Sequence, residues 1–133
     1  MNIKFGYTIV YVANVPEILD FYRRAFGFTT KFLHEGNDYG ELATGDTVIG
    51  FANHQLGKMN LPEGYLSADV KTLPLGMELV LVTDKVEQVF KQAIIEGAIA
   101  VQPPQLKPWN QTVAYLRDPQ GTLIELCNPI VGN

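Results

Sequence analysis

The apolar positions of the first half of the chain predict a strand, a helix and three more strands. Residues 3–12 are rich in β-branched and aromatic side chains, which favours a strand. Apolar residues then recur at helical spacing over Val15–Phe26. Asn14 and Glu17 form a capping box before this helix, and Gly27 suits its C-terminal cap. Three further strands are expected at residues 28–34, 39–43 and 48–53.

The second half of the chain repeats this order of elements. A strand is expected over Met77–Val82, followed by a helix that Asp84 caps and Gly97 ends. Glu87 stands at the third position of that helix, as Glu17 does in the first. The remaining elements are a short strand near 99–101, a stiff proline-rich loop over 103–108, and strands at 112–116 and 122–127.

Matched residues in the two halves indicate a duplicated unit. Val12 corresponds to Val82 and Gly27 to Gly97, each pair 70 residues apart, and residues 48–53 align with 123–128. Residues 55–74 carry glycine and proline and little periodicity, which predicts a linker. We therefore expect an α+β fold in one domain over residues 1–133, with module one at about 3–54, the linker at 55–74 and module two at about 75–129.

Three segments of the chain resemble the vicinal oxygen chelate superfamily, which includes glyoxalase I, bleomycin-resistance proteins and extradiol dioxygenases. They are residues 14–28, with Asn-Val-Pro-Glu-Ile-Leu-Asp-Phe-Tyr and Phe-Gly-Phe, residues 40–46, and the closing Asp-Pro-Gln-Gly-Thr-Leu-Ile-Glu-Leu of residues 118–126. The resemblance implies two tandem βαβββ modules that form an open cup of mostly antiparallel strands, with helices outside. It also implies a homodimer and a small-molecule ligand inside the cup.

Composition and charge limit the classes of molecule that the protein is expected to bind. The 133 residues are 47% hydrophobic and 18% charged, an ordinary globular composition, and the net charge is −4. An acidic chain is a poor match for nucleic acid, and no apolar run is long enough to span a membrane. A single cysteine excludes an intrachain disulfide framework, so we expect a cytoplasmic protein. The acidic balance favours a neutral or cationic ligand.

The resemblance places the metal-binding positions of the enzymes at four residues of this chain, Tyr7, Gly50, Met77 and Glu125. Glu125 alone offers a suitable oxygen ligand, because a phenol, a missing side chain and a thioether bind Mg²⁺, Mn²⁺ or Zn²⁺ poorly. A strand register one residue later would replace Met77 by Glu78 and still supply no histidine. We therefore predict no metal and no cofactor.

Strand alternation predicts an apolar and aromatic cup with one carboxylate at its floor. Leu79 and Leu81 are expected to share the face of Met77 and Glu125, and Gly50 leaves room for a ligand. Trp109 follows the proline-rich loop and is a candidate for stacking on the ligand. The predicted ligand-binding residues are Tyr7, Ile9, Tyr11, Gly50, Met77, Trp109 and Glu125.

Each of these side chains has a plainer interpretation. Tyr11 suits a structural core, and Glu125 suits hydrogen bonds to hydroxyls such as that of Tyr7. Trp109 suits a dimer contact or a loop anchor.

No catalytic residue is predicted. Cys127 lacks a nearby base and is interpreted as a small buried residue. His34 and His54 flank turns and are expected at the surface.

The sequence therefore predicts metal-independent binding or sequestration of a small organic molecule, cationic or aromatic, of the bleomycin-resistance type. The alternatives are a metal-dependent enzyme resembling glyoxalase I or the dioxygenases, and a non-catalytic member whose cup is closed by its own side chains.

Overall fold

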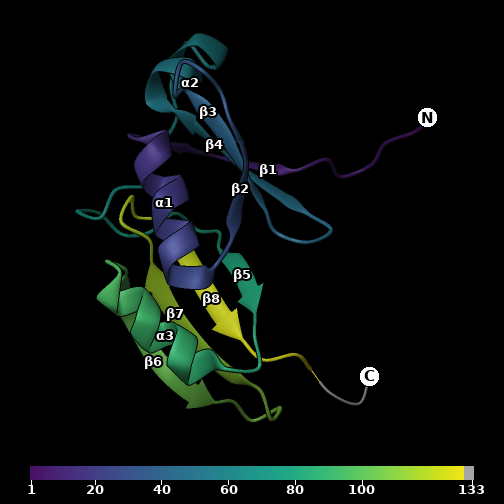
Figure 1. Cartoon of the computed structure of the whole chain (residues 1–133), viewed down its shortest axis with the longest axis vertical. Helices are drawn as coiled ribbons and strands as arrows, with labels where there is room; N and C mark the ends of the chain where they lie inside the picture. Colours follow the sequence, from purple (N-terminus) through teal and green to yellow (C-terminus); the bar gives the residue numbers. More distant parts are fainter. Residues whose placement is uncertain (131–133) are drawn as a thin grey trace. The chain divides into compact units, whose positions relative to one another are not determined.

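The computed structural model describes residues 1–130, which form two units in succession. The first unit is Met1–Ser67 and the second begins at Ala68, so the boundary falls inside the segment predicted as a linker. Each unit holds a four-stranded mixed sheet with a helix packed on one face (Figure 1). The prediction of an α+β fold with two tandem βαβββ modules is confirmed.

Module one follows the expected order and adds a short helix. Its elements are β1 (Thr8–Val12), α1 (Val15–Phe26), β2 (Thr29–Leu33), β3 (Tyr39–Ala43), β4 (Val48–Asn53) and α2 (His54–Asn60). The sheet order is β1-β4-β3-β2. Strand β1 runs parallel to β4, and the other neighbours are antiparallel.

Helix α1 has the predicted bounds because its caps and its apolar face agree. The Asn14 side chain accepts a hydrogen bond from the Glu17 backbone N–H at 3.0 Å, and the helix ends at Gly27 in a left-handed conformation. Its buried face packs on the sheet, where the Tyr22 ring lies 5.3 Å from that of Phe51. This layer is the core of module one.

Module two repeats the βαβββ order over Leu79–Cys127. Its elements are β5 (Leu79–Val82), α3 (Val86–Ile95), β6 (Ile99–Leu106), β7 (Thr112–Arg117) and β8 (Leu123–Cys127). The sheet order is β5-β8-β7-β6, with β5 parallel to β8. The α3 face of this sheet buries Ala114, Leu116, Ile124 and Leu126.

The prediction that Asp84 caps α3 is wrong. The Lys85 backbone N–H donates to the Thr83 hydroxyl at 3.1 Å, and this local turn delays the helix until Val86. Lys85 occupies the N-cap position and makes no side-chain capping bond. The helix consequently starts 71 residues after α1 starts at Val15, rather than 70.

Two predicted strands have different bounds in the structure because of how they pair. Strand β1 begins at Thr8, opposite Ile49, because residues 3–7 extend beyond the paired part of β4. Strand β6 continues through the prolines of the predicted loop, since an edge strand with register shifts tolerates residues that lack an N–H.

Helix α2 lies in the segment predicted as an irregular linker. The Asn53 side chain caps it by accepting from the Leu56 N–H at 2.9 Å, and the Tyr65 ring stacks on Tyr11 with centroids 4.8 Å apart. His54 Nδ1 lies 2.8 Å from the Tyr65 hydroxyl, so His54 is half-buried and its predicted exposure is wrong. His34 is exposed, as expected.

No helix in residues 1–130 meets the length and apolarity that a membrane crossing requires, and the longest has 12 residues.

Candidate functional site

The strand registers decide which side chains lie on the sheet face away from the helix. In module one, Ile9 of β1 stands opposite Gly50 of β4. In module two, Val80 of β5 stands opposite Glu125 of β8. Paired residues on neighbouring strands point to the same face, and the residues on either side of them along β4 and β8 are buried toward the helix. Gly50 and Glu125 therefore occupy equivalent positions, on the helix-free face of their modules.

The predicted register of β5 is wrong by one residue. Leu79 pairs with Ile124 and Leu81 with Leu126, so both leucines point toward α3 instead of sharing the face of Glu125. The first strand of module two is displaced by 71 residues from that of module one, so Glu78 and not Met77 is the equivalent of Tyr7. Glu78 is the candidate site residue that the predicted register missed, although the one-residue alternative pointed to it.

Glu78 and Glu125 form a carboxyl pair, joined by a side-chain hydrogen bond. This hydrogen bond, together with burial and the charge of Glu125, raises the pKa of Glu78 to about 7. The physical cause is that two adjacent carboxylates repel when both are ionised, so the pair retains one proton near neutral pH. The pair therefore carries a negative charge near neutral pH, and this charge would attract a cationic group.

Tyr115 and Cys127 stand beside the carboxyl pair. Tyr115 of β7 pairs directly with Glu125, and burial followed by the Glu125 charge raises the pKa of its hydroxyl. Burial also raises the pKa of the Cys127 thiol, with Glu125 as the second cause. Cys127 is 4% exposed and stays protonated at neutral pH, which suits a small buried residue and not a nucleophile.

Exposed apolar side chains flank the carboxyl pair. Val80 is 49% and Val82 63% exposed, and both lie on the helix-free face of β5. Isolated exposed valines are ordinary, but two on the same strand face next to a carboxyl pair form an amphipathic surface. We call Glu78, Val80, Val82, Tyr115 and Glu125 the module-two site.

The equivalent face of module one is filled by its own side chains. A Cβ atom added to Gly50 would lie 2.5 Å from the Tyr39 hydroxyl oxygen, so the predicted room for a ligand at Gly50 is taken by Tyr39. This hydroxyl donates to Glu41 Oε2 at 2.6 Å, and Lys31 Nζ lies 3.9 Å from Glu41 Oε1. Burial and the Glu41 bond raise the pKa of Tyr39 well above its usual range. Glu41 was not among the predicted site residues, and Tyr39 was only a weaker candidate for contacting a ligand.

The other predicted ligand residues have varied surroundings. Tyr7 and Ile9 are 52% and 42% exposed in module one, while Tyr11 is covered by the stacked Tyr65 ring. Trp109 is 60% exposed, and its indole N–H donates to Gln111 Oε1 at 2.8 Å. Met77 is 59% exposed and lies just before β5.

The donor set does not fit the metal of the related enzymes. Module two contributes the carboxylates of Glu78 and Glu125, but the equivalent positions of module one are Tyr7 and Gly50. Across residues 1–130, no group of three or more His, Cys, Asp or Glu side chains is arranged to hold an ion. Two carboxylates alone are fewer protein ligands than the usual site provides.

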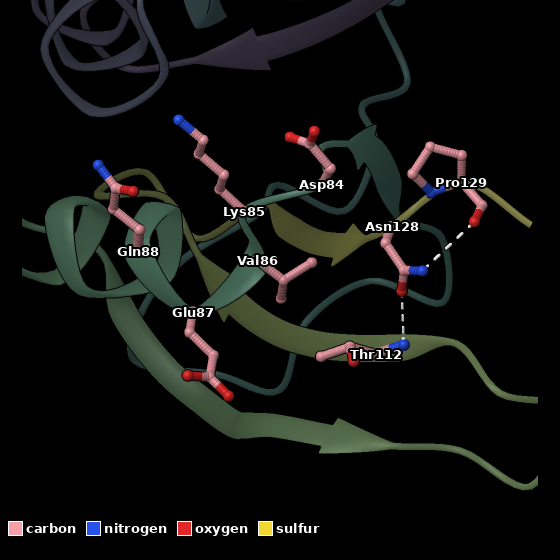
Figure 2. A pocket seen from close by; sticks show the side chains of 8 residues that line it. All are labelled: Asp84, Lys85, Val86, Glu87, Gln88, Thr112, Asn128 and Pro129. Carbon is pink, nitrogen blue, oxygen red and sulfur yellow. Dashed lines mark hydrogen bonds between the residues drawn. The ribbon is translucent and has the colours of Figure 1, made fainter.

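A separate hollow of about 600 Å³ opens at the start of α3 (Figure 2). Its lining residues are Asp84, Lys85, Val86, Glu87, Gln88, Thr112, Asn128 and Pro129. Asn128 Oδ1 accepts from the Thr112 backbone N–H at 2.6 Å, which ties the ends of β7 and β8 together. Side chains of both charge signs line the hollow without converging on a point, so it provides no defined ligand geometry.

Comparison with known proteins identifies the family. The model of the glyoxalase-like domain matches residues 5–131. The chain belongs to the glyoxalase-like domain family. It is thereby a member of the vicinal oxygen chelate superfamily, as the sequence resemblance indicated. No match was found among curated proteins.

Solved structures share the fold at low sequence identity. A glyoxalase-related enzyme from Fulvimarina pelagi is 15% identical, with 95% of this chain and 88% of that chain covered and a TM-score of 0.80. A glyoxalase/bleomycin resistance protein/dioxygenase family enzyme from Burkholderia phytofirmans is 23% identical over 92% and 96% of the two chains, with a TM-score of 0.73. TioX from Micromonospora is 22% identical over 93% and 98%, with a TM-score of 0.66.

Proposed function

We propose that this glyoxalase-like protein binds a small organic molecule that combines a positive charge with an apolar or aromatic body. The ligand occupies the module-two site and is held without any bond being made or broken. The function is then sequestration, of the kind suggested by the bleomycin-resistance name that some structural neighbours carry.

The carboxyl pair is the observation that carries this proposal. A cationic group beside Glu78 and Glu125 would neutralise their mutual repulsion and favour full ionisation of both. The exposed Val80 and Val82 side chains would cover the apolar body of the ligand. Trp109, exposed on the β6–β7 hairpin of the same module, offers a ring face for stacking.

Calorimetric titration with a cationic acridinium dye tests the charge requirement. The Glu125→Gln variant should bind about tenfold more weakly, because the positive group loses a charged partner. Glu35→Gln is the matched control, since Glu35 lies in an exposed turn of module one and should leave affinity unchanged. An anionic dye of similar size should not bind. Equal binding of both dyes, or no effect of Glu125→Gln, would refute the proposal.

The affinity should also depend on pH. Below about pH 7 the Glu78 carboxyl is protonated, and above it this group adds a negative charge to the site. Cation binding should therefore strengthen as pH rises from 6 to 8, and Glu78→Gln should flatten this dependence. Metal analysis of the purified protein is a necessary companion measurement, because stoichiometric Zn²⁺ or Mn²⁺ would favour the metal-dependent alternative.

We further propose that the protein is a homodimer, as the superfamily resemblance implies, and that it is cytoplasmic, as its single cysteine suggests. Light scattering after size exclusion should give about twice the chain mass of 14.8 kDa. A monomer over the whole accessible concentration range would contradict this assignment.

A further inference from the structure

Arg117 is a buried arginine that the proposed binding function does not use. It lies in β7 of module two and is 7% exposed. An arginine side chain stays protonated at any physiological pH, so a buried guanidinium needs acceptors for its N–H groups. Here the acceptors are three backbone carbonyls: Nε donates to Gly121 O at 3.0 Å, Nη1 to Thr72 O at 2.7 Å and Nη2 to Asp69 O at 2.7 Å.

Two of these carbonyls belong to a turn, Asp69–Thr72, which we call the linker turn. The turn has its own hydrogen bonds: Asp69 Oδ1 accepts from the Lys71 N–H at 2.9 Å, and Asp69 O accepts from the Thr72 N–H and hydroxyl, each at 3.1 Å. It precedes β5 by only a few residues. Arg117 therefore attaches the chain segment that leads into β5 to the far end of β7.

The turn between β7 and β8 makes a second, independent contact with the linker turn. A Cβ atom added to Gly121 would lie 2.7 Å from the Asp69 carbonyl carbon and 2.9 Å from the Val70 nitrogen. The two backbones are thus in direct contact, and Gly121 adopts a φ of +99° that other residues rarely adopt. The linker turn is docked on module two by backbone packing as well as by the arginine.

Glu78 lies between this docked turn and the first paired residue of β5. Thr72 is fixed on one side, and Leu79 is fixed on the other by its pairing with Ile124. Only a short connecting segment separates these anchors, so the place of the Glu78 backbone depends on both. We propose that Arg117 is a positioning residue, which holds the linker turn on module two and thereby keeps Glu78 beside Glu125. This inference rests on the proposed function only in taking Glu78 as part of the ligand site.

Limited trypsin digestion tests whether Arg117 holds the linker turn. Lys71 lies inside the turn, and cleavage after it requires the segment to detach locally. In Arg117→Lys, which keeps the charge but loses the three-way donor geometry, cleavage after Lys71 should be about tenfold faster. Cleavage after Lys58 in module one should not change, and Arg23→Lys, at an exposed arginine of α1, should behave as the unaltered protein.

Carboxyl carbon NMR tests the positioning role directly. In Arg117→Lys the titration midpoint of Glu78 should fall from about 7 toward its ordinary value of 4.5, because Glu78 would spend less time beside Glu125. Asp69→Ala should act in the same direction and serves as a second variant if Arg117→Lys does not fold. It removes the Lys71 hydrogen bond without touching the sheet.

Faster cleavage with an unchanged Glu78 midpoint would overturn the proposal, and so would an unchanged cleavage rate. Neither readout involves a ligand. Failure of dye binding would therefore refute the proposed function and leave the role of Arg117 standing.

Discussion

The two modules have the same strand order but use their helix-free faces in opposite ways. At the equivalent positions of the last strand, module one has Gly50 and module two has Glu125. In module one the Tyr39 hydroxyl occupies the space over Gly50 and bonds Glu41, so the polar groups satisfy one another. In module two Glu125 meets a second carboxyl group, and the resulting charge is left for a partner. The two modules share one backbone scaffold, and single side chains decide whether its helix-free face is filled or carries an exposed carboxyl group.

The largest loss of stability should come from a substitution on the helix-free face of module one, where Tyr39 fills the space over Gly50. Gly50→Ala places a Cβ atom against the Tyr39 hydroxyl and should lower the free energy of unfolding by about 1–3 kcal/mol. Gly36→Ala is the control, since Gly36 has only ordinary contacts and the change should stay within about 0.5 kcal/mol. Urea unfolding measures both. A Gly50→Ala variant as stable as the original protein would show that Tyr39 is free to move and that the face is not closed.

Substitutions before the helices α1 and α3 should change the stability of the protein by a smaller amount, and by different amounts in the two modules. Asn14→Ala removes the side-chain acceptor of α1 and should cost about 1 kcal/mol of stability. Asp84→Ala, at the residue that the sequence predicted as the cap of α3, should cost less than about 0.5 kcal/mol because Lys85 occupies the N-cap position there. Thermal unfolding of the two variants gives the comparison. Equal losses would mean that Asp84 caps α3 in solution.

Removing one carboxyl group of the Glu78–Glu125 pair should stabilise the folded protein slightly, in contrast to the two destabilising changes above. The folded protein retains a proton on Glu78 that the unfolded chain releases at its ordinary pKa of 4.5, so stability falls as pH rises from about 4.5 to about 7. Glu78→Gln removes this penalty. It should stabilise the protein by about 1 kcal/mol or less at pH 8, after allowing for solvent screening of an exposed group, and by nothing at pH 4. Denaturant unfolding at both pH values measures the difference, and a loss of stability at pH 8 would contradict the pairing.

Local signals predicted most of the fold and part of the candidate site. The helix Val15–Phe26 and strands β3 and β4 were predicted with their observed bounds, because capping, periodicity and turn residues agreed there. Helix α2 was missed because its periodicity is weak, and its Tyr65 contact to Tyr11 spans many residues of sequence. The prolines of β6 suggested a loop, since nothing local shows that a strand lies at a sheet edge.

The candidate site was harder to predict than the fold, because its residues depend on strand register. Glu125 was recognised from its strand and its motif, but its partner depended on a one-residue register in β5. Strand alternation turns such an error into the opposite face, so Met77 and Glu78 exchange roles. Tyr39 and Gly50 lie on consecutive strands, and only the register of β3 against β4 reveals that the Tyr39 side chain fills the space left by Gly50.

The sequence by itself determined the duplicated βαβββ order, the superfamily and the positions at which chemistry is to be sought, because these depend on periodicity, caps and turns within each segment. The tertiary structure alone decided that Glu78 joins Glu125, that Tyr39 closes the face of module one and that Arg117 holds the linker turn. These facts depend on strand register and on contacts between distant segments, which are set when the sheets pair and the side chains compete for the same space.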